Sequence, residues 1–252
     1  MTHLDQLIET VGILRSPQGC PWDREQTFNS LIPCIIEECY ELVEAIETNM
    51  TENIIEEAGD VLLQVIMIAT IANETRTFSI QTIAETVNQK MIARHPHVFN
   101  KTTLNTADEV LKQWDDIKER EKPRQSQLDN IPPLPALIKA EKIQKRAAKD
   151  GFDWDKTTDA IKKVSEEIHE FSHELNKNNN QESLEEEAGD LLFAIINVLR
   201  KENINPETAL RKANQKFITR YQTMESLSAD FKSLSLTDKE KLWVKAKQLT
   251  KS

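Results

Sequence analysis

The chain has 252 residues and a formal net charge of −10 at pH 7, and it is poor in glycine and aromatic residues. Its length allows one large or two small domains, and its acidity argues against a broad basic face for nucleic acid. Its three cysteines fit neither a zinc site nor a disulfide framework, and its longest apolar run is too short to span a membrane. Its N-terminus also lacks the form of a signal peptide. We therefore expect a cytoplasmic protein.

The first predicted element is an amphipathic helix over residues 4–14, followed by a loop that reads GCPWD at residues 19–23. The second half of the chain carries a similar loop, GFDWD at residues 151–155. We expect the tryptophan of each loop, Trp22 or Trp154, to anchor the loop over the end of a helical bundle. The shared Gly-x-x-Trp-Asp pattern indicates an internal repeat.

A longer repeat follows each loop. Residues 37–60 read EECYELVEAIETNMTENIIEEAGD, and residues 166–190 read EEIHEFSHELNKNNNQESLEEEAGD. Each copy has an EExxE helix with an apolar stripe, which in the first copy is expected to include Cys39 and Ile46, then a polar turn and a second, largely apolar helix. At ~100° per residue, the acids of EExxE and ExxD lie beside the apolar stripes, so an antiparallel hairpin would bring four carboxylates together.

Four carboxylates at the edge of a core repel one another and lose hydration, which a divalent cation would offset. Ligation by oxygen alone favours Mg²⁺, with Mn²⁺ as a substitute. A di-iron site is an alternative because Glu170-x-x-His173 has suitable spacing, but the first half has no equivalent; solvated surface acids are another. A glycine in each ExxD helix, Gly59 or Gly189, indicates close approach of a neighbouring backbone or a ligand. The predicted ligands are Glu38, Glu41, Glu57 and Asp60, and Glu167, Glu170, Glu187 and Asp190.

Two further helices carry the third repeat. Ser79 is a predicted N-cap for a helix over residues 80–94, and Asn205-Pro206 for one over residues 207–221. These helices read NQKMIAR and NQKFITR near their ends, which places Lys90 with Arg94, and Lys216 with Arg220, on one face. Such a face suits an anion such as phosphate, although a basic patch that neutralises neighbouring acids is the alternative.

A fourth repeat pairs a tryptophan with a lysine one helical turn later, as Trp114 with Lys118 and Trp243 with Lys247. Each pair could present a flat apolar surface and a cation to a nucleotide. Equally, each could be a core aromatic residue beside a solvated lysine.

Four of the nine prolines fall within residues 121–135, which predicts a linker or extended strap. It would separate an N-terminal helical domain, 1–120, from a C-terminal one, 136–252. The second domain opens with a helix over residues 137–149, whose basic face, including Arg146, is expected to be solvated. Because no segment alternates as a strand does, we predict an all-α fold of two tandem helical bundles.

With these motifs the sequence resembles the MazG family of nucleoside triphosphate pyrophosphohydrolases over nearly its whole length. The matching segments are GCPWD, EECYE, both EEAGDxL runs, RHPHVF at residues 94–99, KIQKRA at residues 142–147 and GFDW. The resemblance implies all-α bundle units, usually dimeric, that use Mg²⁺ to split NTPs and dNTPs into monophosphate and pyrophosphate. It assigns the metal to the same eight acids, and substrate contacts to Lys216, Arg220, Trp243 and Lys247, with Lys90, Arg94, Trp114 and Lys118 at the matching positions of the first half.

The chain departs from some relatives at Asn53 and Ser183, where those relatives carry a lysine. The hypothesis is metal-assisted hydrolysis with weak selection among bases, mainly in the second half, with Glu166 or Glu186 accepting the proton of the attacking water. A homodimer that cleans the nucleotide pool, without nucleic-acid or membrane partners, is expected. The alternatives are a regulatory protein that binds nucleotide and Mg²⁺ without turnover, a helical interaction scaffold, and an enzyme that releases orthophosphate.

Overall fold

The computed structural model describes residues 1–100, 104–121, 125–177 and 180–250. The chain forms two compact units, Met1–Glu121 and Lys122–Ser252. All regular elements in the described residues are helices, which confirms the all-α prediction. Within those residues, no helix combines the length and apolarity that a membrane span requires. Residues 122–124 of the expected linker and 178–179 of the expected turn lie outside the described part.

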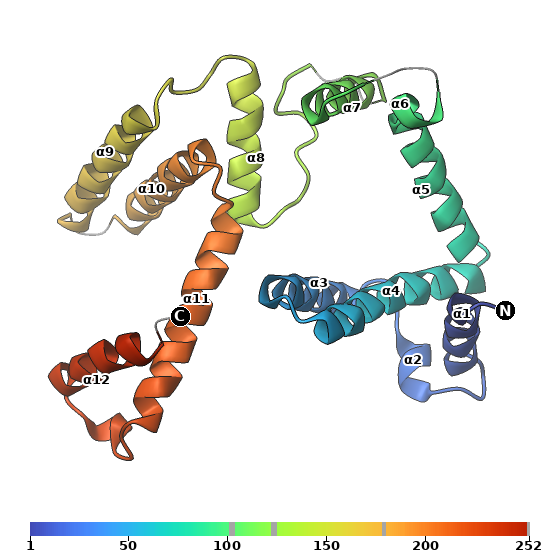
Figure 1. Cartoon of the computed structure of the whole chain (residues 1–252), viewed down its shortest axis with the longest axis horizontal. Coiled ribbons are helices and arrows are strands. Elements are labelled where there is room, and N and C mark those ends of the chain that lie inside the picture. Colours follow the sequence, from blue (N-terminus) through green and yellow to red (C-terminus); the bar gives the residue numbers. More distant parts are fainter. Residues whose placement is uncertain (101–103, 122–124, 178–179, 251–252) are drawn as a thin grey trace. The chain divides into compact units, whose positions relative to one another are not determined.

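Unit 1 is built on a helical hairpin, α3 with α4, against which α1 and α5 pack (Figure 1). The hairpin reverses at Asn49, whose left-handed backbone (φ 55°) ends α3. A core of Val11, Leu31, Ile66 and Met67 joins the hairpin to α1. The helices are α1 (His3–Leu14), α2 (Pro21–Glu25), α3 (Leu31–Thr48), α4 (Thr51–Glu74), α5 (Ile80–Arg94), α6 (Pro96–Phe99) and α7 (Ala107–Glu121).

Unit 2 repeats this plan with a hairpin of α9 and α10, while α8 packs on α10 and α12 packs on α11. A second small core of Met224, Phe231 and Ala246 lies between α11 and α12. Asn205 caps α11 as predicted, since its side chain accepts a hydrogen bond from the backbone of Thr208. The elements are α8 (Ala136–Lys149), α9 (Thr157–Leu175), α10 (Gln181–Lys201), α11 (Pro206–Ser226), the 3₁₀ turn η1 (Phe231–Ser233) and α12 (Leu236–Leu249).

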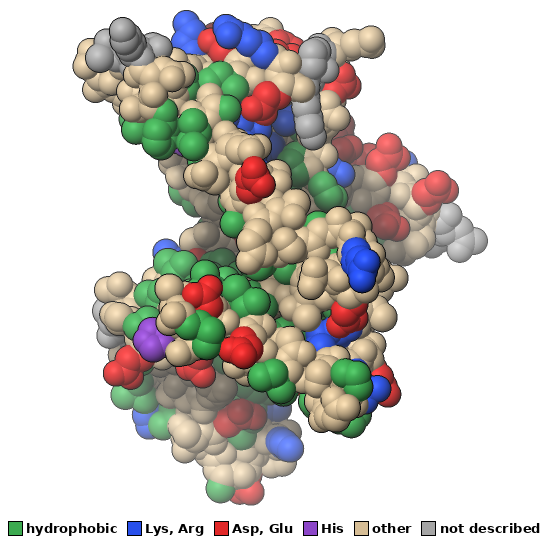
Figure 2. Space-filling view, turned by 90° about the vertical axis from the view of Figure 1, so that its right-hand side faces the viewer, with side chains coloured by type: hydrophobic (Ala, Val, Ile, Leu, Met, Phe, Trp, Pro, Cys, Tyr) green, Lys and Arg blue, Asp and Glu red, His purple; other side chains and the backbone are tan. Residues whose placement is uncertain are grey.

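The apolar stripe predicted for α3 is partly wrong. Leu31 and Ala45 are buried, but Cys39 is exposed and so is Ile46. The helix is apolar on more than one side, so periodicity alone could not tell which side the rest of unit 1 covers. Figure 2 likewise shows hydrophobic side chains exposed among charged ones on the face in view.

The two tryptophan loops are held by arginines, and the prediction that Trp22 and Trp154 anchor them is wrong. Trp22 is 62% exposed and Trp154 is 46% exposed. In unit 1 the Arg15 guanidinium donates to the backbone carbonyls of Asp23, within α2, and of Gln26, just after it, and forms an ion pair with Glu74. Arg15 is buried, so a charge and not a ring fixes this loop.

The strap before α8 is held in the same way. Arg146 donates from Nη1 to the carbonyl oxygens of Gln127, at 3.1 Å, and Asp129, at 2.6 Å. The prediction that Arg146 lies on a solvated basic face is therefore wrong. Glu121 also differs from expectation, because it is the last residue of α7 and not part of the strap.

Candidate metal and phosphate sites

In unit 1 the hairpin brings three of the four predicted metal ligands together. Carboxylate oxygens of Glu38 and Glu41 on α3, and of Glu57 on α4, lie within 4.8 Å of one another. Loss of hydration, then repulsion from Asp60, raises the pKa of Glu38, and the pKa of Glu57 is raised in the same direction. Asp60 is therefore close enough to act electrostatically on the cluster. The donor set is all oxygen and crowded with like charge, which fits a hard divalent cation.

Unit 2 forms a matching cluster from α9 and α10. Carboxylate oxygens of Glu167, Glu187 and Asp190 lie within 4.8 Å of one another. Loss of hydration, then repulsion from Glu170 and Glu167, raises the pKa of Glu187. Glu167 is only 4% exposed. The donor set is again oxygen alone, which fits a hard divalent metal.

A lysine that sequence analysis missed lies at this second cluster. Nζ of Lys163 is 2.7 Å from an oxygen of Glu166 and 2.7 Å from an oxygen of Glu167. These two contacts raise the pKa of Lys163 above its usual range. The sequence spacing could have predicted this contact, since a lysine four residues before a glutamate lies on the same face of a helix. The first half has Cys34 four residues before Glu38, so the two acid clusters are not equivalent.

The two candidate bases have different surroundings. Glu166 is engaged by Lys163 in one hydrogen-bonded ion pair, with 2.7 Å between Nζ and Oε1. Glu186 is exposed on α10, and its carboxylate has no ion pair among the residues that the structure describes. The Glu166 carboxylate is thus occupied by a partner that the Glu186 carboxylate lacks within the described residues.

Three of the four residues predicted to bind substrate in unit 2 come together between α11 and α12. The guanidinium of Arg220 and Nζ of Lys247 each lie 5.7 Å from the centroid of the Trp243 ring. Phe217 packs against the same ring at 5.2 Å between centroids. Lys216 is exposed one helical turn before Arg220. Two cations near one aromatic ring could hold a phosphate chain and a base.

The corresponding residues of unit 1 also gather, but with an acid among them. Nζ of Lys118 lies 5.3 Å from the Trp114 ring, and His95 meets that ring edge-on at 4.8 Å. Arg94 forms an ion pair with Glu121, with 2.5 Å between Nη2 and Oε2.

Within unit 2 the acids and the basic residues form separate clusters. Figure 1 shows α12 beside the half of α11 that is remote from α10. The acid group consists of residues of α9 and α10, whereas the Trp243 contacts join α11 to α12. One copy of the unit therefore does not bring the predicted ligands and the predicted phosphate contacts into a single pocket.

The glycines of the ExxD helices do not serve close helix packing. Apart from the adjoining residues and backbone of its own helix, a Cβ at Gly59 or Gly189 would meet no atom of the described residues within 4 Å. The expectation of a neighbouring backbone at these positions is therefore wrong, while the alternative of a bound ligand stays a prediction.

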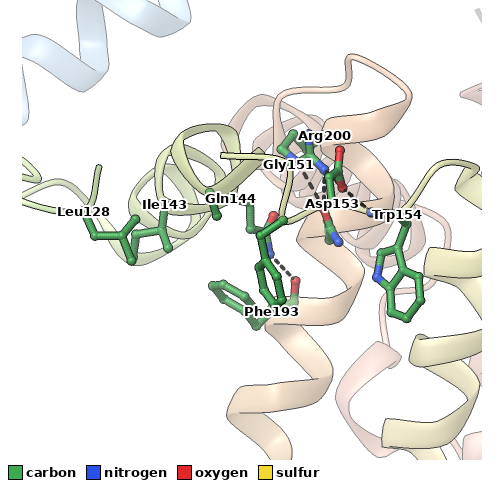
Figure 3. Close-up of a pocket in the computed structure, with 11 residues that line it drawn as sticks. Leu128, Ile143, Gln144, Gly151, Asp153, Trp154, Phe193 and Arg200 are labelled. Carbon is green, nitrogen blue, oxygen red and sulfur yellow. Dashed lines mark hydrogen bonds and ion pairs between the residues drawn. The ribbon is translucent and has the colours of Figure 1, made fainter. Parts of the chain in front are cut away.

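A cavity of about 430 Å³ lies beside the GFDWD loop (Figure 3). Apolar side chains including Ile143 and Phe193 form most of its wall. The amide of Gln144 donates to the carbonyl oxygen of Phe193 at 2.8 Å, whereas its own oxygen is buried without a partner among the described residues. Sequence analysis did not predict this cavity, and none of the predicted site residues lines it.

Comparison with known proteins connects the chain to one family. The model of the MazG nucleotide pyrophosphohydrolase domain matches the chain twice, over residues 26–99 and 156–224. The Thermotoga maritima protein named nucleoside triphosphate pyrophosphohydrolase/pyrophosphatase MazG is 44% identical over 250 residues, covering 96% of this chain and 95% of that protein. The Escherichia coli K12 nucleoside triphosphate pyrophosphohydrolase is 40% identical over 258 residues, covering 98% of each. A crystal structure of a mazG-related protein from Thermotoga maritima is 26% identical, with a TM-score of 0.40, over 46% of this chain and 98% of that one.

Proposed function

The chain belongs to the MazG nucleotide pyrophosphohydrolase family, and on that premise we propose that it hydrolyses NTPs and dNTPs to the monophosphate and pyrophosphate with Mg²⁺. The observation that carries the proposal is the duplicated carboxylate cluster at the hairpins. Crowded, partly dehydrated carboxylates destabilise the fold unless a cation binds them, so their presence in both units favours a metal-dependent function.

In unit 2 the metal would be held by Glu167, Glu187 and Asp190, with Glu170 nearby. When bound, Mg²⁺ supplies charge that offsets the triphosphate and lowers the pKa of a coordinated water. Lys163 holds Glu167 in its rotamer and neutralises it in the metal-free protein. It thereby keeps the ligand positioned before substrate arrives.

Substrate recognition falls to the cluster around Trp243. Arg220 and Lys247 would bind phosphate oxygens, because guanidinium and ammonium groups make strong charge-assisted bonds to them. The Trp243 ring would stack on the base or ribose. Stacking accepts every base, so we expect broad selectivity and a role in cleaning the nucleotide pool.

Proton transfer is assigned to Glu186. Of the two candidates, its carboxylate is the one without an ion pair in the described part of the chain, whereas Lys163 engages Glu166. Glu186 would accept the proton of the attacking water, a role that commonly contributes about 10²–10⁴ in rate.

We also propose that the chain works as a homodimer. Large apolar side chains on the unit 2 hairpin are exposed in a single copy, among them Ile168, Leu192 and Phe193. A second copy would cover them. It would also allow the acids of one copy to meet the basic cluster of the other, which a single unit 2 keeps apart.

Identification of the products tests the proposed reaction. Phosphorus NMR of a dNTP incubated with the protein and Mg²⁺ should show monophosphate and pyrophosphate, and chelation of the metal should stop the reaction. Release of orthophosphate would assign a different bond to the enzyme. Tight nucleotide binding without any product would instead support a regulatory nucleotide-binding protein.

A further inference from the structure

The two basic clusters differ at one matching position. Glu121 stands three residues after Lys118, and Thr250 stands three residues after Lys247. Both residues contact the arginine of the neighbouring helix, Arg94 or Arg220. The repeat therefore places a carboxylate in unit 1 where unit 2 has a neutral hydroxyl.

In unit 1 the contact is a two-pronged ion pair. Nε of Arg94 lies 3.2 Å from Oε1 of Glu121, and Nη2 lies 2.5 Å from Oε2. The side chain of Arg94 is 17% exposed and that of Glu121 is 35% exposed. Two parallel bonds from one guanidinium to two oxygens are also how arginine binds a phosphate.

The same carboxylate faces the other cations of unit 1. Hydrogen bonding to Arg94 lowers the pKa of Glu121, and the charges of Lys90 and Lys118 lower it further. These are three of the four side chains that were predicted to bind substrate in the first half. Glu121 therefore lies where the geometry would otherwise place a substrate phosphate.

Unit 2 presents its cations to neutral groups. Nε of Arg220 lies 3.4 Å from the Thr250 hydroxyl, and both its guanidinium and Nζ of Lys247 lie 5.7 Å from the centroid of the Trp243 ring. Over the residues that the structure describes, neither Arg220 nor Lys247 forms an ion pair with a carboxylate. An incoming anion meets uncompensated positive charge there.

We propose that Glu121 is an internal occupant of the unit 1 anion site, and that the exchange of glutamate for threonine at this position makes unit 2 the stronger triphosphate site. The proposal rests on the proposed function for the identity of the anion. A phosphate entering unit 1 must displace a carboxylate that already binds Arg94, and then lies beside that negative charge. Glu121 is thus a residue that sets affinity without touching the substrate.

The test uses inorganic tripolyphosphate, measured by calorimetry in the full chain with one basic cluster silenced. With unit 2 silenced by Arg220→Met and Lys247→Met, Glu121→Gln should raise the affinity of unit 1 by about tenfold, since the competing charge is gone while the side chain keeps its size. With unit 1 silenced by Arg94→Met, Thr250→Glu should lower the affinity of unit 2 by a similar factor.

Asp116→Asn is the matched control, because it removes one charge from an exposed position of the same helix. It should change the affinity of unit 1 less than twofold. An equal gain from Asp116→Asn, or no gain from Glu121→Gln, would overturn the proposal, as would unchanged binding in Thr250→Glu. Absence of turnover by the unmodified protein would refute the proposed reaction instead, and would leave these binding results interpretable.

Discussion

Individual carboxylates in each acid cluster destabilise the folded state while no cation is bound. Loss of hydration and repulsion raise the pKa values of Glu38, Glu57 and Glu187 above their ordinary range. The negative charges of the neighbouring carboxylates disfavour the ionised form of each of these side chains. The same arrangement offers several carboxylate oxygens, the ligands that a hard divalent cation prefers, within 4.8 Å of one another.

Glu187→Gln should therefore have opposite effects with and without metal. It removes one repelling charge, so the metal-free protein should unfold at a higher temperature than the unmodified chain. It also removes a ligand, so the stabilisation of unit 2 by Mg²⁺ with a non-hydrolysable triphosphate should be lost. Thermal unfolding monitored by circular dichroism measures both effects. A variant with unchanged metal-free stability and a full response to Mg²⁺ would contradict the assignment of Glu187.

The assignment of Glu186 as the base predicts that neutralising Glu186 lowers the rate more than neutralising Glu166. Glu186→Gln should lower kcat by about 10²-fold with little change in KM, because proton transfer occurs only in the reaction. Glu166→Gln should have a smaller effect, since Lys163 already holds that carboxylate. Initial rates of pyrophosphate release give both numbers. A larger loss in Glu166→Gln would reverse the assignment.

Helical spacing predicted four acids at each hairpin, of which three gather, whereas Asp60 and Glu170 lie outside the two groups. It also could have indicated Lys163, which lies one turn before Glu167. The ion pair of Arg94 with Glu121 could not be predicted from the sequence, because it joins α5 to α7 and the sequence does not specify how those helices pack. The exposed tryptophans were missed for a related reason, since size and apolarity do not say which side of a loop is covered.

At the scale of elements, the GFDWD loop is fixed by a charge network. Asp153 lies 2.5 Å from Nη2 of Arg200 and 3.3 Å from Nζ of Lys201, both on α10. Burial raises the pKa of Asp153, but hydrogen bonds from Arg200 and Lys201 outweigh this, so its pKa is below the ordinary value. The loop is therefore tied to the end of the helix that carries the unit 2 acids.

Asp153→Asn should lower the free energy of unfolding by about 2 kcal/mol at neutral pH, since hydrogen bonds to a charged group are lost. Because the pKa of Asp153 is lowered on folding, its contribution is complete above its unfolded value of about 3.9 and is lost as the pH falls through the folded value. Urea unfolding at pH 7 and below pH 4 should show the difference from the unmodified protein shrinking. A difference that stays constant with pH would exclude the ion pair as its cause.

Helix starts were the most predictable elements. Ser79 caps α5 and Asn205 caps α11, because a side-chain oxygen before the first turn has a free backbone N–H to accept from. Burial along α3 was less predictable. Cys39 and Ile46 fit the apolar period but are exposed, since the sequence does not specify which of two apolar sides faces α4 and α1.

Across the whole molecule, the sequence repeat corresponds to two units that share a plan but not their details. Unit 2 has Lys163 at its acids and Thr250 at its basic cluster, where unit 1 has Cys34 and Glu121. The repeat could be recognised from the motifs alone. The separation of acids from basic residues within unit 2 could not be predicted from the sequence, because it depends on where α12 packs along α11.

The central claim is that each hairpin binds a divalent cation through its acids, and electron paramagnetic resonance of Mn²⁺ tests it most directly. Titration of the full chain should show Mn²⁺ bound at both clusters and displaced by Mg²⁺. Glu57→Gln should remove the binding of unit 1, Glu187→Gln that of unit 2, and the double variant both. Undiminished Mn²⁺ binding by the double variant would show that these carboxylates do not hold the metal.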